Sequence, residues 1–305
     1  MTSQVLQLAM FVAGTPLLAL WVATARPPSR LDAMLIALTA VLHLAMVWKA
    51  GPVWTVAGSF WPPLFAVLLA LALWRLALVI PPVLITKPLR PAVFVLAFVV
   101  AALAVQNVLI WRARPADPPP LDLEWPLRGG KFVVVHGGRS SLVNHHVGIA
   151  AQRDALDIVA VNAAGLRAGG ILPKQLDRYR VFGMEVFAPC GGEVVAARDG
   201  IADSGAMEED PALAAGNYLA IACQGHTVLL AHLQSGSVAL RTGDTVEAGR
   251  PIGRAGSSGN SSEPHLHIHA VTGRVTDGLQ LITSASGVPM RFGGRVLMRN
   301  DVVRN

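Results

Sequence analysis

Charged residues are scarce in the first third of this 305-residue chain. A soluble domain usually carries about a quarter of its residues as charged side chains. The stretch 1–111 departs far from that share, and its apolar composition excludes an ordinary water-exposed surface. Its only charged residues are Arg26, Arg30, Asp32, Lys49, Arg75, Lys87 and Arg90.

Several patterns of well-known function are also missing. The chain has just two cysteines, Cys190 and Cys223, whose spacing excludes a Cys-x-x-Cys redox motif. No His-Glu-x-x-His motif is present, so the zinc peptidases that carry two ligands and a general base on one helix are excluded. The net charge is +6, but the basic residues are scattered without a nucleic-acid module. We therefore predict no nucleic-acid partner.

Four apolar stretches of the first third are candidate membrane spans, because a helix needs ~20 mostly apolar residues to cross the hydrocarbon core. Two polar residues inside them, Arg75 and His43, are interpreted as a snorkelling cation and a packed helix residue. We predict an α-helical multi-span region over residues 1–111, in contact with the lipid bilayer. The four stretches cover residues 1–25, 33–48, 62–80 and 91–111.

Basic residues between these stretches predict the orientation in the membrane. Arg26 and Arg30 follow the first stretch, and Lys87 and Arg90 precede the fourth. Cytoplasmic loops are enriched in Lys and Arg, so four crossings leave both chain ends outside. We predict a multi-pass protein of the cytoplasmic membrane, with the rest of the chain on the extracytoplasmic side.

The sequence changes character after the last apolar stretch. Residues 112–129 are rich in proline and predict a semi-rigid linker. Residues 130–305 contain short apolar runs separated by glycine-containing turns, without repeats or long amphipathic helices, and predict a mostly-β domain. The runs that resemble strands cover residues 131–135, 181–187, 193–197, 218–222, 227–232 and 266–270.

The predicted β domain concentrates possible metal ligands. In His265–His267 the two histidines alternate on a strand, so both imidazoles lie on one face about 7 Å apart. His232 ends another predicted strand, Asp157 lies in an apolar context, and His145–His146 precede it. Taken singly, such residues are more often structural. Together they supply the three N or O ligands of a catalytic zinc, with histidines left over for acid–base chemistry.

These residues belong to a longer pattern. In order and spacing, roughly residues 130–295 resemble the lysostaphin/LytM-type peptidoglycan endopeptidases. The resemblance implies an antiparallel β metallopeptidase domain with one zinc ion, which hydrolyses peptide bonds of peptidoglycan. The segments that carry it are Phe187–Val195, Gly216–Ile221, Leu230–Leu233, Thr242–Gly253, Gly256–Asn260 and Pro264–His267.

The resemblance also implies roles for single residues. Asp157 and His267 match the family's zinc ligands. His232 and His265 match its two catalytic histidines, which orient the water and stabilise the developing oxyanion. Without a Glu general base, the imidazoles must also move the protons.

The chain departs from the family pattern at one ligand. The compact form of the family has a histidine four residues before the aspartate, where this chain has Arg153. A guanidinium has no lone pair to offer a metal. The ligand must then come from further upstream, where His145 and His146 are the candidates. The resemblance to chains with a longer His-to-Asp gap favours His146.

Other residues have no matched catalytic role. His136, His226 and His269 are interpreted as structural or surface residues, although the strand alternation leaves an approach of His269 to the site open. Cys190 and Cys223 predict a disulfide, because an even pair outside the cytoplasm commonly closes; two separate buried thiols are the alternative.

The predicted function is that of a membrane-anchored zinc metalloendopeptidase acting on cell-wall peptidoglycan. A catalytically silent relative that binds wall peptide or activates another hydrolase is the main alternative. A sensor role for the membrane region also stays open. A full set of ligand-capable residues favours the enzyme.

Overall fold

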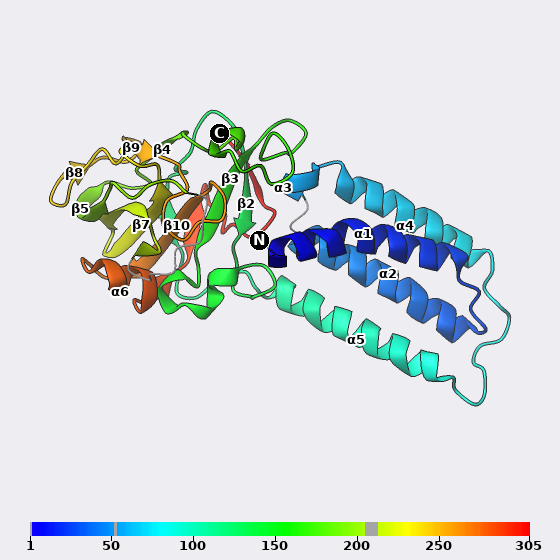
Figure 1. Ribbon diagram of the computed structural model, residues 1–305. Coiled ribbons are helices and arrows are strands. Elements are labelled where there is room, and N and C mark those ends of the chain that lie inside the picture. Colours follow the sequence, from blue (N-terminus) through cyan, green and yellow to red (C-terminus); the bar gives the residue numbers. More distant parts are fainter. Residues whose placement is uncertain (1, 52–53, 205–212) are drawn as a thin grey trace. The chain divides into compact units, whose positions relative to one another are not determined.

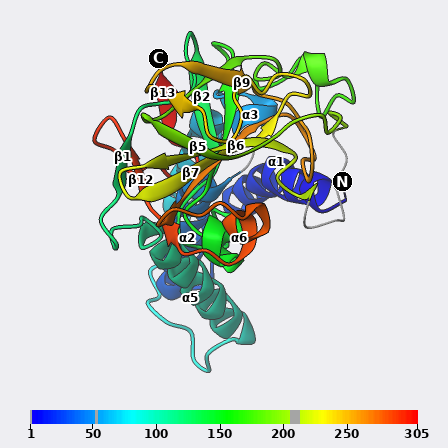
Figure 2. The ribbon, with the colours of Figure 1, turned by 90° about the vertical axis from the view of Figure 1, so that its left-hand side faces the viewer.

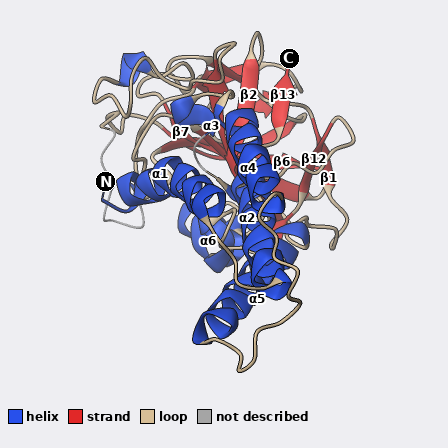
Figure 3. Ribbon diagram, turned by 90° about the vertical axis from the view of Figure 1, so that its right-hand side faces the viewer, coloured by secondary structure: helices blue, strands red, loops and turns tan. Residues whose placement is uncertain are grey.

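The chain forms two compact units in the computed structural model, which describes residues 2–51, 54–204 and 213–305. One unit spans residues 1–112 and the other residues 113–305. The first unit is helical, and the described strands all belong to the second (Figure 1; Figure 3).

The helices of the N-terminal unit follow the predicted apolar stretches closely. Proline occupies the first turn of the fourth and fifth helices, where its missing N–H is not needed. The unit's small core joins side chains of three helices, among them Val22, Ile36 and Leu69. The helices are α1 Thr2–Thr24, α2 Arg30–Ala50, α3 Trp54–Ala57, α4 Trp61–Ala77 and α5 Pro91–Trp111.

Two of these helices, α2 and α5, are long and apolar enough to cross a membrane. The apolar helical part Val12–Thr24 and helix α4 are shorter than such a span. The four helical stretches are therefore confirmed as helices, whereas four membrane crossings stay a prediction. His43 Nε2 lies 3.0 Å from Thr15 Oγ1, as expected of a packed helix residue.

The C-terminal unit is built on a nine-stranded sheet whose pairings are all antiparallel. The strand order is β13-β2-β3-β10-β7-β6-β5-β8, and β11 pairs with β10. Figure 2 shows β5, β6 and β7 side by side. The bounds are β2 Lys131–His136, β3 Leu156–Val161, β5 Gly192–Arg198, β6 Asn217–Cys223, β7 His226–Leu233, β8 Thr245–Val246, β10 Leu266–Thr272, β11 Gly287–Val288 and β13 Val302–Arg304.

Shorter elements surround this sheet. Strand β1 pairs in parallel with β12, and β4 pairs antiparallel with β9. Sequence patterns missed most of these short strands and also β3, which carries Asp157. The bounds are β1 Leu121–Leu123, β4 Glu185–Phe187, β9 Pro251–Arg254, β12 Met290–Phe292, η1 His145–Gly148, η2 Ala150–Gln152, η3 Leu176–Arg178 and α6 Gly278–Thr283.

The central strands are buried on both faces, and the alternation of β10 shows how they divide the core. Leu266 and Ile268 belong to the larger cluster of buried apolar residues on one face. Val271 belongs to a second cluster, which includes Leu281 of α6, on the other face. Because side chains alternate along a strand, His267 and His269 point to this second face.

Part of the stretch predicted as a linker lies in the C-terminal unit instead. Strand β1 pairs with β12, and Leu121, Leu123 and Leu127 are buried in the larger cluster. The proline run favoured a linker over this whole stretch. The apolar residues that follow it are too few to form a recognisable strand pattern.

The two cysteines are joined. Cys190, just after β4, and Cys223, at the end of β6, form a disulfide with their Cα atoms 6.2 Å apart. Both are buried in the larger apolar cluster. The predicted pairing is confirmed.

Replacing both cysteines with alanine should lower the free energy of unfolding of the C-terminal unit by about 3 kcal/mol, because the crosslink restricts the unfolded chain. Proteolysis of the full chain in detergent at increasing urea would measure this as an earlier midpoint. Thiol labelling of the unreduced, denatured wild type should detect no free thiol. An unchanged midpoint, or two labelled thiols, would contradict the crosslink.

Candidate metal centre

Asp157 is the centre of a cluster of histidines. It lies on β3 between two apolar residues of the larger core cluster, and its exposed fraction is only 2%. Strand register places His267 of β10 opposite Asp157 on one side, and His136 of β2 opposite it on the other. An irregularity between Val134 and His136 accommodates the second pairing. Two neighbouring strands thus bring imidazoles to one buried carboxylate.

Three donor atoms converge here, all on buried residues. His146 Nε2 lies 2.9 Å from Asp157 Oδ2, and His267 Nδ1 lies 2.9 Å from Asp157 Oδ1. The ligand atoms of His146, Asp157 and His267 all lie within 4.8 Å of one another. Two imidazoles and a carboxylate suit the N and O ligands that zinc prefers.

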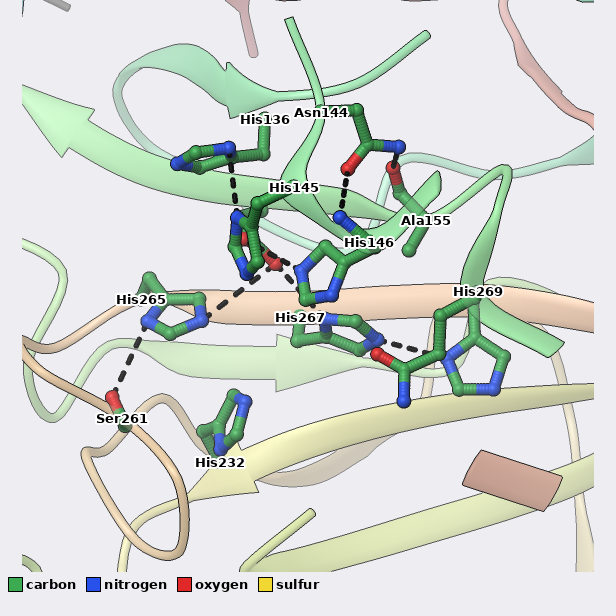
Figure 4. Close-up of polar contacts among 12 residues, drawn as sticks. His136, Asn144, His145, His146, Ala155, His232, Ser261, His265, His267 and His269 are labelled. Carbon is green, nitrogen blue, oxygen red and sulfur yellow. Dashed lines mark hydrogen bonds and ion pairs between the residues drawn. The ribbon is translucent and has the colours of Figure 1, made fainter. Parts of the chain in front are cut away.

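His146 reaches this position from a loop that one asparagine organises. Asn144 is fully buried, and its Oδ1 accepts a hydrogen bond from the His146 amide at 3.0 Å. Its Nδ2 donates to the carbonyls of Arg153 and Ala155, at 3.2 and 3.4 Å. Asn144 therefore ties the start of the loop to its end, just before β3 (Figure 4).

The adjacent residue, His145, is turned to another partner. Its Nδ1 lies 2.9 Å from His136 Nδ1, and the side chain is exposed. His136, His145 and Asp157 also bring their ligand atoms within 4.8 Å of one another. Both upstream candidates thus lie near Asp157, but the set that includes His146 is the fully buried one.

Arg153, at the position where the compact form of the resembled family has a histidine, points away from Asp157. Its Nη2 donates to the carbonyl of Gly287 at 3.4 Å, and its Nε lies 3.4 Å from Asp154. The guanidinium is engaged with the segment that carries β11 rather than with Asp157.

The two predicted catalytic histidines are anchored by backbone carbonyls. His232 Nδ1 donates to Ser258 O at 2.8 Å, and His265 Nδ1 donates to Glu263 O at 2.9 Å. In their neutral forms, both rings therefore carry the lone pair on Nε2. His265 Nε2 lies 3.6 Å from Asp157 Oδ1, and the ring centroids of His232 and His265 are 4.7 Å apart (Figure 4).

His232 depends on a close approach of two segments. Its backbone φ is +59°, in the left-handed region, where strain is common at functional sites. Its acceptor, Ser258, packs against Gly216, where a Cβ would lie 2.4 Å from the Ser258 carbonyl. Gly216 also has a positive φ of +60°, so only glycine fits there without strain. The backbone N–H of Asn217, the next residue, donates a hydrogen bond to Ser258 Oγ.

Burial governs the charge states in the cluster. It lowers the pKa of His232 and His269, to about 3 and about 4, and it lowers that of His267 well below its usual range. Burial alone would raise the pKa of Asp157, but His146 and His265 hold this pKa well below its ordinary value. An ionised carboxylate thus faces several largely neutral imidazoles, as a cation site requires.

His269, predicted to be a structural or surface residue with an approach to the site left open, is buried beside His267. Its exposed fraction is 1%, and its Nδ1 lies 2.8 Å from His267 Nε2. Its Nε2 lies 3.0 Å from the carbonyl of Leu281 in α6. The alternating histidines at 265, 267 and 269 indicated in the sequence that His269 could lie beside His267. The same spacing does not show that His269 is buried.

A comparison with protein-family models finds a match in the C-terminal unit. Residues 180–277, which include three of the site's histidines, match the model of peptidase family M23. No curated protein matches the chain. His146 and Asp157 lie before the matched range.

Three solved structures illustrate the likeness. Lysostaphin is 26% identical over 32% of this chain and 35% of its own, with a TM-score of 0.24. A zinc-containing peptidase from Vibrio cholerae is 20% identical over 49% of this chain and 34% of its own, with a TM-score of 0.27. A putative peptidase M23 from Pseudomonas aeruginosa is 19% identical over 60% of this chain and 60% of its own, with a TM-score of 0.29. This chain therefore covers less than two thirds of each of them.

The upstream ligand can be identified by two matched substitutions. His146→Ala should lose most of the bound zinc, because its Nε2 is one of the three buried donors. His145→Ala should retain most of it. Elemental analysis of metal per chain after dialysis measures both. The reverse order would assign the ligand to His145, and full occupancy in the double variant would show that the ligand set is wrong.

Proposed function

We propose that this chain, whose residues 180–277 match the model of peptidase family M23, is a membrane-anchored zinc metalloendopeptidase that hydrolyses peptide bonds of cell-wall peptidoglycan. The main support is the convergence of three buried donors on one point, with two further anchored imidazoles beside them. The family match supports peptide-bond hydrolysis as the reaction class. The three donors could bind the metal, and the two imidazoles could transfer protons.

The donor set fits one metal ion. His146 Nε2, a carboxylate oxygen of Asp157 and His267 Nδ1 would hold it, because these atoms already lie close together in a buried position. Bound zinc lowers the pKa of a water molecule and polarises a scissile carbonyl. A site of three protein ligands leaves a position open for that purpose.

The two anchored histidines, His232 and His265, would then have different roles in acid–base catalysis. His232, whose pKa is lowered to about 3 by burial, stays neutral and presents Nε2 as an acceptor that orients the attacking water. A proton on His265 Nε2 would lie beside the Asp157 carboxylate, 3.6 Å away. From there it can be donated to the developing oxyanion or to the leaving amine.

A silent relative of the same fold is the alternative, and a missing ligand or catalytic histidine would support it. Here each implied role has a residue capable of it, including the displaced upstream ligand. This complete set favours the enzyme over a binding protein.

The location outside the cytoplasm, with the membrane as anchor, is part of the proposal. Helices α2 and α5 have the length and apolar composition of spans. Large apolar side chains of α5 point outward in the N-terminal unit: Phe94 is 62%, Phe98 74% and Trp111 81% exposed. Such a surface suits a lipid environment, where the second unit would reach the wall.

The zinc-loaded full chain in detergent should release new amino groups from isolated peptidoglycan, and a chelator should abolish the release. His232→Ala and His265→Ala should each reduce the rate at least ~100-fold while zinc stays bound, because they act on protons rather than on the metal. His267→Ala and Asp157→Ala should lose the zinc itself.

The matched control is His226→Ala, since His226 lies at the start of β7 and pairs with the far end of β10. It should cleave as the wild type does. A zinc-loaded wild type that releases nothing from peptidoglycan would favour the silent relative. Loss of metal in His265→Ala, with metal kept in His267→Ala, would invert the assignment within the pair.

The orientation is tested separately. A reporter that is active only in the cytoplasm should be silent when fused after Asn305, because four crossings leave this end outside. The same reporter fused after Thr86, in the basic loop before α5, should be active. Strong activity at Asn305 would reject the four-span arrangement or the wall substrate.

A further inference from the structure

Four groups form a continuous line of hydrogen-bond distances that begins in the candidate zinc site: Asp157, His267, His269 and the Leu281 carbonyl. His267 Nδ1 faces Asp157, and the opposite nitrogen of the same ring, Nε2, lies 2.8 Å from His269 Nδ1. His269 Nε2 lies 3.0 Å from the carbonyl oxygen of Leu281. The line runs from a buried carboxylate of β3 to the backbone of α6.

The protons on this line have one consistent arrangement. A carbonyl oxygen only accepts, so His269 Nε2 must donate to Leu281. The His269 ring is 1% exposed, and no carboxylate among the described residues is in hydrogen-bond contact with it. A buried imidazolium without such a partner would be costly. The ring is therefore neutral, its Nδ1 carries the lone pair, and His267 Nε2 must be the donor between the two rings.

This arrangement determines which atom His267 can offer to a metal. With the proton held on Nε2, Nδ1 is left with its lone pair directed at Asp157 Oδ1, 2.9 Å away. Two lone pairs at that separation require a cation between them, either a proton or a metal ion. We propose that His269 is a positioning residue that holds His267 in the form that binds metal through Nδ1, with the carbonyl of Leu281 as the fixed end of the line.

The fixed end is itself held in place. The amides of Ser284 and Ala285 both bond to Gln280 O, which leaves the Leu281 carbonyl at the end of α6 for the imidazole. Gln152 Nε2 donates to the neighbouring Ile282 carbonyl at 2.6 Å, from the loop that precedes β3. The same loop carries His146. The packing of α6 is thereby coupled to both histidine ligands of the proposed site.

The proposal concerns the metal site of the proposed function, and its test reads tautomer and metal affinity rather than hydrolysis. The full chain in detergent is labelled with ¹⁵N at histidine, and the His269 signals are assigned by their absence from His269→Gln. In the wild type, His269 should be protonated on Nε2 and unprotonated on Nδ1, both without metal and with zinc. Protonation on Nδ1 would overturn the inference.

Two substitutions test the consequence for zinc. His269→Phe fills the space but offers no acceptor to His267 Nε2–H, so zinc affinity, measured by competition with a chelator, should fall ~10–100-fold. His269→Gln carries both an acceptor and a donor and should restore most of it. His226→Gln, remote from the line, should bind zinc as the wild type does.

The outcomes separate this inference from the proposed function. Wild-type zinc affinity in His269→Phe overturns the positioning role, whatever the chain hydrolyses. If the tautomer and the affinity ratios are as expected but the loaded chain leaves peptidoglycan intact, the positioning role stands and the proposed activity fails. If His269→Phe does not fold, the tautomer of the wild type and the affinity of His269→Gln still decide the question.

Discussion

The buried carboxylate of Asp157 is the constraint on which the site depends. An ionised carboxylate with 2% exposure costs several kcal/mol unless cations or hydrogen-bond donors surround it. The sheet brings imidazoles beside this carboxylate by register, with His136 opposite on one neighbouring strand and His267 opposite on the other. The loop ending at β3 adds His146. The imidazoles gathered around this buried charge are therefore the ones that could hold a metal ion, and such an ion would compensate the charge.

Backbone carbonyls complete this arrangement. The carbonyl oxygens of Ser258, Glu263 and Leu281 each accept a hydrogen bond from one imidazole of the cluster, at 2.8, 2.9 and 3.0 Å. A carbonyl cannot change its role, whereas a side chain can rotate or titrate. Each of these contacts thus directs a lone pair inward without adding charge. The three carbonyls lie outside the strands that carry the histidines, so the surrounding loops and α6 determine the proton positions within the sheet.

His146, the proposed upstream ligand, reaches Asp157 from a loop, although the chain has Arg153 four residues before this aspartate. Two short 3-10 turns precede β3, the first of which contains His146, and Asn144 closes this loop onto its own end. Because the cost of closing a loop rises only slowly with its length, the longer separation is tolerated. Arg153 is free to bond to Gly287, and its neighbour Asp154 pairs with Arg139 at 2.6 and 2.7 Å.

The amino-acid sequence by itself determined the two-part organisation and most of the long elements, because apolar periodicity and charge content are local properties. It also determined the supply of candidate ligand and catalytic histidines, since the spacing of His265 and His267 places them on the same face of an extended segment. It did not predict β3, β1 or the burial of His269, because these depend on partners more than a hundred residues away or on which face of a strand is covered. Register and burial are set by pairing between distant segments, and so only the tertiary structure decided which histidines meet Asp157 and which nitrogen each of them presents.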